Sequence, residues 1–266
     1  MGVSLRIHGY TQDPETKEYL ILMQYANDGN LFSYLEKNIN KLTWSIKLRY
    51  LHDIAARLSI IHGLGLIHCD LHAKNIILNR EKGATLSNPY ICDLGVSRPV
   101  NSQTSRYYGI KEYIAPEVWQ NRQYLQASDI YSFGILMAHI ATGEPPFRDK
   151  AMLDIHCGGS RPTLPASTPE PYKQLAGKCW DKDPNRRPTI SEVLNTIKRL
   201  ISEIDKDASL KKIWDERLDK SIKSLSQAEK MRYSSSSYEG MRKNRVLFIV
   251  INSKCIKNEF SINYVY

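Results

Sequence analysis

Apolar positions recur along the chain in patterns that predict its main elements. Two apolar-rich segments, 3–10 and 18–26, flank the stretch TQDPETK, whose residues are typical of a turn, and together they predict a β-hairpin. Between 44 and 62 the apolar residues recur at helical spacing, which predicts a helix with one buried face. Thr43 is the expected N-cap of this helix and Gly63 its expected stop.

Most of the chain between this helix and residue 204 also carries a helical pattern. An almost wholly apolar stretch, 128–141, is typical of a helix that is buried on all sides. The other expected elements are a short helix at 31–37, short strands at 75–78 and 90–92, and amphipathic helices at 170–180 and 190–204. The pattern therefore predicts a helical body that follows a hairpin.

The composition changes after the last amphipathic helix. Residues 205–230 are rich in charge and are compatible with a solvated helix, and 234–237 is a run of serines. The apolar run 246–251 has strand propensity, but the sequence names no partner for it. We therefore expect one domain at 1–203, followed by a charged and poorly ordered tail at 204–266.

Composition excludes several classes of protein. The longest unbroken apolar run has six residues, whereas a membrane-spanning helix needs about 20, so no span is expected. The net charge is +9, but no cluster of Lys and Arg with interleaved aromatic residues occurs, so no nucleic-acid partner is expected. The five cysteines are odd in number and form no CxxC pair, and no secretory signal is visible. These features favour the reducing environment of the cytoplasm.

Two segments carry candidate chemistry. In LIHCDLHAKNIIL, Asp70 and Asn75 lie on a predicted loop before a strand. The carboxylate can accept a proton from an attacking hydroxyl, and the amide oxygen can ligate Mg²⁺. In YICDLG, Asp93 ends a predicted strand and precedes Gly95, where its carboxylate can contact a metal ion that bridges phosphates. The first segment alone would also recur by chance in a large proteome.

Further motifs follow these two segments in a fixed order. IAPE occupies 114–117, SDIYSFG contains Asp129, and CWDKDPNRRPT occupies 179–189. Taken together, the set resembles the protein-kinase superfamily in the order that this family uses, and its ending is most similar to the tyrosine-kinase-like branch. The resemblance covers about 3–200 and implies an α+β fold with a mainly helical large lobe.

The resemblance implies a catalytic role for three residues. Asp70 matches the base that orients the substrate hydroxyl and takes its proton. Asn75 and Asp93 match the two Mg²⁺ ligands of the family. The implied activity is transfer of the γ-phosphate of ATP to a protein Ser or Thr hydroxyl, or to that of Tyr, so the implied partners are ATP, Mg²⁺ and a protein substrate.

The nucleotide site implied by the resemblance falls in LILMQYANDGNL and in the strand that follows Asn75. Met23 lies at the gatekeeper position, and Gln24 and Ala26 fall on the hinge whose backbone would bind adenine. Ile77 matches the apolar floor under the adenine ring. These four residues are the cofactor-binding candidates beside Asp93.

Three further matches imply structural roles. Glu117 and Arg187 match the buried ion pair that holds the activation segment to the large lobe. Asp129 matches the helix residue that hydrogen-bonds the backbone of the catalytic loop. We expect these three side chains to hold the geometry of the site without taking part in the reaction.

The chain also departs from the pattern of the family. Cys69 replaces the Arg that normally pairs with a phosphorylated activation loop, so this switch is expected to be absent or rewired. His72 replaces the phosphate-binding Lys of Ser/Thr kinases, and Lys74 is the candidate to supply that charge instead, which makes it a catalytic candidate beside Asp70 and Asn75. Leu94 replaces a Phe of the metal-binding triplet. Ile110 lies where Ser/Thr kinases usually have Thr, so the choice between Ser/Thr and Tyr as the acceptor stays open.

Parts of the family pattern are missing from these 266 residues. None of the fourteen glycines forms a G-x-G-x-x-G, and no Ala-x-Lys precedes Met23. The resemblance therefore implies a small-lobe remnant at 1–26 and a large lobe at 27–203, with a hairpin that has lost its sheet partner.

Three functions remain open at this point. The first is a protein kinase whose sequence here is incomplete, and the second is a non-catalytic kinase-fold protein that acts by binding. The third is a small-molecule phosphotransferase, because HCDLHAKN also resembles the loop of those enzymes. IAPE, SDIYSFG and the RRP segment favour a protein kinase over this third function.

Overall fold

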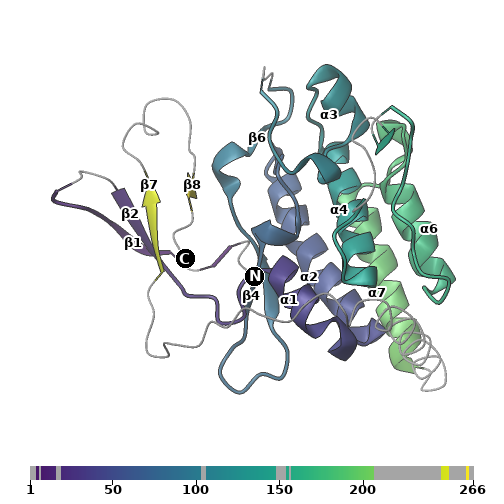
Figure 1. The fold of residues 1–266 in the computed structure, drawn as a ribbon, viewed down its shortest axis with the longest axis horizontal. Helices are drawn as coiled ribbons and strands as arrows, with labels where there is room; N and C mark the ends of the chain where they lie inside the picture. Colours follow the sequence, from purple (N-terminus) through teal and green to yellow (C-terminus); the bar gives the residue numbers. More distant parts are fainter. Residues whose placement is uncertain are drawn as a thin grey trace, which may run out of the picture.

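The described chain forms a helical body with a small sheet to one side of it (Figure 1). This is a computed structural model, and it describes residues 4–5, 7–15, 19–102, 106–147, 154–155 and 157–206 and the strands β7 (Leu247–Ile251) and β8 (Ile262–Asn263). Long helices and short strands together confirm the predicted α+β class.

The helical body contains the elements that the apolar pattern predicted, with ends shifted by a few residues. Its helices are α1 (Leu31–Asn38), α2 (Trp44–Gly63), α3 (Pro116–Asn121), α4 (Gln126–Thr142), α6 (Glu170–Cys179) and α7 (Ile190–Lys206). Its short antiparallel strand pairs are β3 (Leu66–Ile67) with β6 (Arg98–Pro99), and β4 (Ile76–Asn79) with β5 (Asn88–Ile91). Single 3-10 turns connect them at η1 (Ile39–Lys41), η2 (Ala73–Asn75), η3 (Leu94–Val96), η4 (Lys111–Tyr113) and η5 (Pro184–Arg186).

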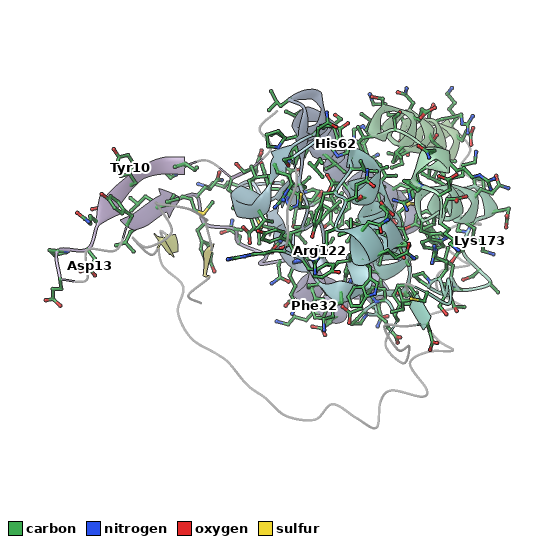
Figure 2. All side chains as sticks on the ribbon, turned by 90° about the horizontal axis from the view of Figure 1, so that it is seen from above. Tyr10, Asp13, Phe32, His62, Arg122 and Lys173 are labelled. Atoms are coloured by element: carbon green, nitrogen blue, oxygen red, sulfur yellow. The ribbon has the colours of Figure 1, made fainter. Side chains whose placement is uncertain are left out.

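The predicted N-terminal hairpin is present. Strand β1 (Ile7–Gln12) pairs antiparallel with β2 (Tyr19–Met23), and the register places Tyr10 opposite Ile21. Figure 2 shows the hairpin extending away from the helical body, with Tyr10 and Asp13 far from the other labelled side chains. Tyr10 is 80% exposed, and β1 is exposed along most of its length, whereas the residues of β2 are half-buried.

The expectation that the hairpin lacks a sheet partner is wrong for the described strands. β7 pairs antiparallel along the whole of β2, and β8 pairs with β7, so the sheet order is β1-β2-β7-β8. The apolar run near the C-terminus thus satisfies the edge of β2, which the sequence could not show because strand propensity carries no information about a distant partner. The predicted helix at 205–230 lies outside the described residues beyond Lys206, where α7 ends.

Helix α2 begins and ends by local chemistry. The Thr43 side chain accepts a hydrogen bond from the Ile46 amide at 3.4 Å, which confirms it as the N-cap. The helix ends at Gly63, which confirms the predicted stop, and Leu64 is the C-cap. Gly65 has a φ of +70°, the left-handed conformation in which glycine ends helices.

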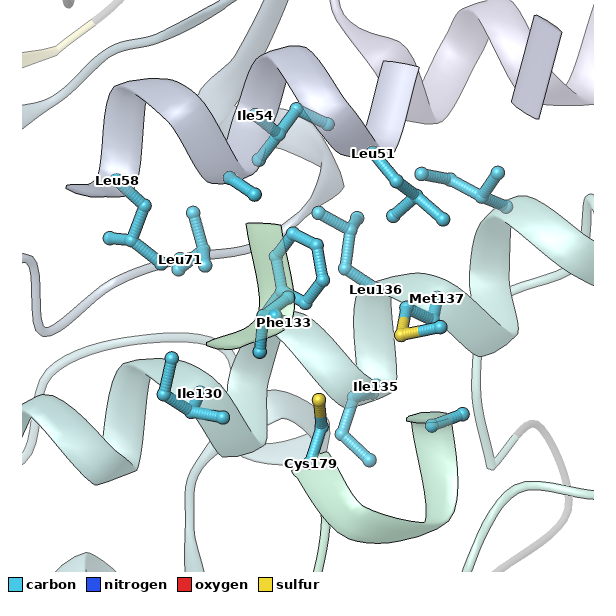
Figure 3. Close-up of a cluster of buried hydrophobic side chains, with 14 of the residues drawn as sticks. Leu51, Ile54, Leu58, Leu71, Ile130, Phe133, Ile135, Leu136, Met137 and Cys179 are labelled. Carbon is cyan, nitrogen blue, oxygen red and sulfur yellow. The ribbon is translucent and has the colours of Figure 1, made fainter. Parts of the chain in front are cut away.

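The core lies between α2 and α4. Leu51, Ile54 and Leu58 of α2 face Phe133 and Leu136 of α4, and all five side chains are buried (Figure 3). Almost every residue of α4 is buried, as the sequence predicted for a helix that is covered on all sides. In the part of the chain that the structure describes, the helices lack the combination of length and apolar character that crossing a bilayer requires.

Helix α4 approaches α6 closely at one glycine. A Cβ added at Gly134 would meet the Cβ of Cys179 at 2.8 Å, which is closer than real Cβ atoms come. Glycine at this position therefore lets the two helices pack with almost no space between them. The close approach fixes α4, and with it the residue Asp129 near its start.

Lys47 belongs to α2, and its buried amine lies against the C-terminal end of α4. Its Nζ donates to the carbonyl oxygen of Ala141 at 2.8 Å and lies 5.0 Å from the centre of the Trp44 ring. Burial lowers the pKa of Lys47 from 10.5 to about 7. Between these two values the unfolded chain binds a proton that the folded chain does not, so this site adds stability as the pH rises.

This pKa shift gives a pH-dependent prediction. From pH 7 to pH 9 we expect the unfolding free energy of wild type to rise by about 2–3 kcal/mol relative to that of Lys47→Met, since one unit of pKa shift is about 1.4 kcal/mol. Urea denaturation at the two pH values measures the difference. The exposed Lys37 provides the control, because Lys37→Met should show the same difference at both. A Lys47→Met difference that is independent of pH would contradict the burial effect.

Candidate functional site

The loop 68–75 joins β3 to β4 and carries Asp70. The Asp70 amide donates to Nδ1 of the buried His68 at 3.2 Å, so the ring hydrogen lies on Nε2, which contacts the Cys92 carbonyl oxygen at 3.1 Å. Burial lowers the pKa of His68, which keeps this ring neutral. The imidazole therefore ties the backbone at Asp70 to the strand end that precedes Asp93.

Asp129 holds the start of the same loop, as the sequence predicted. Its Oδ2 accepts from the His68 amide at 2.8 Å and its Oδ1 from the Cys69 amide at 3.0 Å. Nε2 of His62, at the end of α2, lies 2.9 Å from Oδ2. Cys69 has a φ of +70°, a left-handed conformation that non-glycine residues adopt only when their surroundings impose it. Asp129 imposes it from beneath the loop.

The carboxylate of Asp70 has one enclosed oxygen and one that remains for a ligand. Nε2 of His72 lies 2.9 Å from Oδ1, and the His72 Nδ1 accepts from the Asn75 amide at 3.2 Å, so the ring hydrogen is on the side of Asp70. A Cβ at Gly109, whose φ is +101°, would lie 3.2 Å from the same Oδ1. Oδ1 is buried without a hydrogen-bond partner among the described residues, which leaves Oδ2 as the more accessible oxygen.

The structure brings Asn75 and Asp93 to the same end of the body as Asp70. The Asn75 side chain donates from Nδ2 to the Asp70 carbonyl oxygen at 2.9 Å, which leaves its amide oxygen as the free ligand atom. The Cys92 amide donates to the Asn75 carbonyl oxygen at 2.9 Å, which places Asp93 immediately beside this loop. The predicted juxtaposition of the three residues is therefore present in the fold.

Asp93 is held in an unusual conformation for a carboxylate. Its φ is +59°, and its Oδ1 accepts from the Gly95 amide at 3.4 Å. Burial raises the pKa of Asp93, and the negative charge of Asp70 raises it further. A bound cation would stabilise the charged form of Asp93 against both effects.

The oxygen atoms of Asn75 and Asp93 are too few to hold a metal ion by themselves, but they suit Mg²⁺, which also binds phosphate and water. Among the described residues, no group of three or more His, Cys, Asp or Glu side chains is placed to hold a metal ion. Mg²⁺ is usually bound through one or two carboxylates together with phosphate oxygens and water. Asp93 and the amide oxygen of Asn75 fit that pattern, and both are oxygen donors as this hard cation requires.

The predicted adenine-binding residues lie where the hairpin joins the body. Met23 ends β2, and Gln24 and Ala26 follow it outside any helix or strand, both half-buried. The next residues bind β4, because Asn30 forms a β-bridge with Ile77 and the Leu78 amide donates to the Gly29 carbonyl oxygen at 2.7 Å. These contacts fix the end of the predicted hinge segment against the strand that carries the predicted floor residue.

Lys74 lies in a groove next to the loop. Its Nζ is 5.2 Å from the centre of the Phe32 ring, and the groove of about 240 Å³ is also lined by Ile110, Glu112 and Phe147. The side chain that lies against the Asp70 carboxylate is His72. The sequence identified His72 as a replacement but did not predict this contact, and it gave no sign of the close approach of Gly109.

The predicted ion pair between Glu117 and Arg187 is confirmed. The guanidinium donates to both carboxylate oxygens, at 2.7 and 2.8 Å, and the two side chains are 10% and 0% exposed. The Ser128 hydroxyl donates to the same carboxylate at 2.8 Å, and Arg187 also donates to the carbonyl oxygens of Asp181 and Ala127. The pair joins α3 to the turn before α7 and thereby anchors the end of the segment that begins at Asp93.

The family comparison covers most of the chain. Residues 4–197 match the family model described as protein tyrosine and serine/threonine kinase. Two similar relatives are probable serine/threonine-protein kinases of Dictyostelium discoideum, each 30% identical, over 71% and 73% of this chain and 14% and 32% of their own lengths. A putative serine/threonine-protein kinase/receptor of Acanthamoeba polyphaga mimivirus is 30% identical over 70% of this chain and 12% of its own length.

The chain thus spans less than a third of each of these relatives. The match includes every motif from the loop at Asp70 to Arg187, and in the fold these motifs form an anchored loop, a buried ion pair and an acidic Asp93 beside that loop. The chain belongs to the protein kinase superfamily.

Proposed function

We propose that this chain contributes the catalytic half of a protein kinase site, which transfers the γ-phosphate of ATP to a protein hydroxyl. The observation that carries the proposal is the convergence of Asp70, Asn75 and Asp93 on one end of the body. Similar relatives named serine/threonine-protein kinases favour a Ser or Thr hydroxyl as the acceptor.

Asp70 is the proposed base. Its Oδ2 accepts the proton of the incoming hydroxyl, while Oδ1 is buried 2.9 Å from Nε2 of His72 without a hydrogen-bond partner among the described residues. The His68 contact and the two hydrogen bonds from the loop to Asp129 keep the carboxylate from turning away. Such prior placement is the main contribution that a protein makes to phosphoryl transfer.

Asn75 and Asp93 are the proposed ligands of Mg²⁺. When bound, Mg²⁺ and ATP supply the transferred phosphoryl group and the positive charge that neutralises its oxygens. The buried amide of Asn75 is oriented by its bond to the Asp70 carbonyl oxygen, so it presents only its oxygen. The adenine ring is proposed to bind the backbone of Gln24 and Ala26 above Ile77.

A second function has its own supporting observation. These 266 residues contain no G-x-G-x-x-G and no Ala-x-Lys before Met23, the two parts that bind and orient the phosphates in the family. A polypeptide with these residues alone is therefore proposed to bind Mg²⁺ and ATP weakly and to transfer phosphate below detection. In that form it acts as a kinase-fold binding protein.

Mapping the 5′ end of the transcript separates the two functions. Upstream in-frame coding sequence with both motifs would assign the kinase function, and the longer product should then transfer labelled phosphate from ATP and lose this activity in Asp70→Asn. A longer product that carries both motifs and transfers nothing, or whose transfer survives Asp70→Asn, would overturn the kinase proposal. A transcript that encodes neither motif would assign the binding function.

A further inference from the structure

The Arg98 guanidinium lies against two tyrosine rings. Its Cζ is 4.8 Å from the centre of the Tyr108 ring and 5.2 Å from that of Tyr124, and the two ring centres are 6.3 Å apart. The Nε atom of Arg98 is buried without a hydrogen-bond partner among the described residues, so the aromatic faces provide much of its environment. A cation that is removed from water in this way is attracted to the negative faces of the rings.

These contacts join three separate parts of the fold. Arg98 lies in β6 opposite Ile67, the residue directly before His68. Tyr108 belongs to the segment that runs from Asp93 to Glu117, and Tyr124 lies between α3 and α4. We call Arg98, Tyr108 and Tyr124 the tyrosine clamp.

The backbone of Tyr108 is fixed on both sides by Tyr124. The Tyr124 hydroxyl accepts from the Tyr108 amide at 2.7 Å and donates to the Tyr108 carbonyl oxygen at 3.1 Å. The next residue is Gly109, whose backbone lies against the Asp70 carboxylate. The clamp therefore determines where the segment meets the proposed base.

Arg98 is also the cation next to Cys69. The Cys69 thiol donates to the Ile67 carbonyl oxygen at 3.6 Å, and burial raises its pKa to about 12 although the positive charge of Arg98 opposes this rise. The Cys69 thiol therefore stays uncharged. Unlike an Arg at this position, it offers no positive charge to a phosphate. The nearby positive charge belongs to Arg98, and its guanidinium is already engaged by the two rings.

We propose that Arg98 is a positioning residue that holds the 93–117 segment against the 68–75 loop through Tyr108 and Tyr124, without a phosphorylated residue in that segment. The proposal concerns the regulation of the proposed phosphotransfer site, and only its catalytic consequence rests on that function. The physical link itself is tested without ATP, so either proposal can fail while the other stands.

Limited trypsin digestion of the full chain tests the clamp. Trypsin cleaves after Arg106 and Lys111, which are exposed on either side of Tyr108, while Pro99 protects the bond after Arg98 in the wild type. We expect Arg98→Met to speed cleavage at both sites at least tenfold, with the melting temperature measured in parallel. Arg98→Lys keeps the positive charge and should restore part of the protection.

The matched control uses a similar contact on the neighbouring tyrosine. Arg122 is exposed, and its Cζ lies 5.1 Å from the centre of the Tyr107 ring. Arg122→Met should change cleavage after Arg106 less than twofold, because a solvated cation is held more weakly by a ring. Equal effects of Arg98→Met and Arg122→Met would overturn the proposal.

A double-variant cycle separates the clamp from general loosening. If Arg98 acts through Tyr108, then Arg98→Met combined with Tyr108→Leu should cleave no more than about twofold faster than the faster single variant. Cleavage rates that multiply would overturn the proposal.

A third variant serves if Arg98→Met fails to fold. Tyr124→Phe keeps the ring and removes the hydroxyl, and it should speed cleavage after Arg106 at least threefold. An unchanged cleavage rate would overturn the proposal.

A phosphate mimic tests the independence from phosphorylation. Thr104→Glu with Ser105→Glu adds negative charge to the segment and should leave cleavage after Lys111 within twofold of wild type. Slower cleavage that disappears in Arg98→Met would show that Arg98 is free to bind a phosphate, and the proposal would be wrong.

Discussion

Replacing Arg187 with alanine should lower the free energy of unfolding by about 3–5 kcal/mol, because the change leaves the buried carboxylate of Glu117 without its partner. The two atoms of the guanidinium that contact this carboxylate lie 2.7 and 2.8 Å from its oxygens, and Arg187 also satisfies two carbonyl oxygens. Ser128 provides one remaining hydrogen bond, which is too little for a desolvated charge. Urea denaturation measures the loss.

An exposed ion pair of the same chain provides the control. Arg199 and Glu203 lie 3.8 Å apart on α7 with side chains 70% and 54% exposed, so Arg199→Ala should change the unfolding free energy by less than about 1 kcal/mol. Equal losses in Arg187→Ala and Arg199→Ala would show that burial of the Glu117 pair contributes nothing.

Asp129→Ala should have an effect of similar size and should act on the 68–75 loop. The substitution leaves the amides of His68 and Cys69 without their acceptor and removes the contact to His62. A buried donor that loses its partner costs about 1–3 kcal/mol, so we expect a loss of about 3 kcal/mol or more. Hydrogen exchange of the His68 and Cys69 amides should also become much faster, since the left-handed conformation of Cys69 loses its support.

Asp53 offers a matched comparison for Asp129. It lies on α2, and its carboxylate contacts only the partly exposed ring of His52, at 3.0 Å, among the side-chain contacts that the structure describes. Asp53→Ala should therefore cost less than about 1 kcal/mol and leave exchange in the loop unchanged. Unchanged exchange in Asp129→Ala would contradict the anchoring role.

The sequence predicted the parts of the fold that local patterns determine. Helix α4 has almost no polar surface, and Thr43 before an apolar period indicates a helix start, so both were readable. The pairing of β7 with β2 was not readable, because it joins segments from opposite ends of the chain. Helix α2 ends at the predicted Gly63, whereas the left-handed conformation of Gly65 two residues later was not visible in the spacing.

The candidate site was predictable to a similar extent. Motif order selected Asp70, Asn75 and Asp93 as candidates, and the fold brings these three residues together, while their roles stay a prediction. Side-chain direction was not contained in that order. Lys74 lies over Phe32, and His72 lies against Asp70, because the hydrogen bond from the Asn75 amide turns its ring toward the carboxylate.

Binding of ATP in the presence and absence of Mg²⁺ tests the central claim, that Asn75 and Asp93 form a metal-dependent nucleotide site. In a thermal-shift titration of the 266-residue chain, we expect ATP to raise the melting temperature weakly and only with Mg²⁺. Asp93→Asn should abolish this shift while keeping the fold, because Asn tolerates the left-handed conformation. Asp70→Asn should preserve the shift, because the proposed role of Asp70 is toward the acceptor hydroxyl and not toward the nucleotide. A shift that is independent of Mg²⁺, or one that survives Asp93→Asn, would contradict the account.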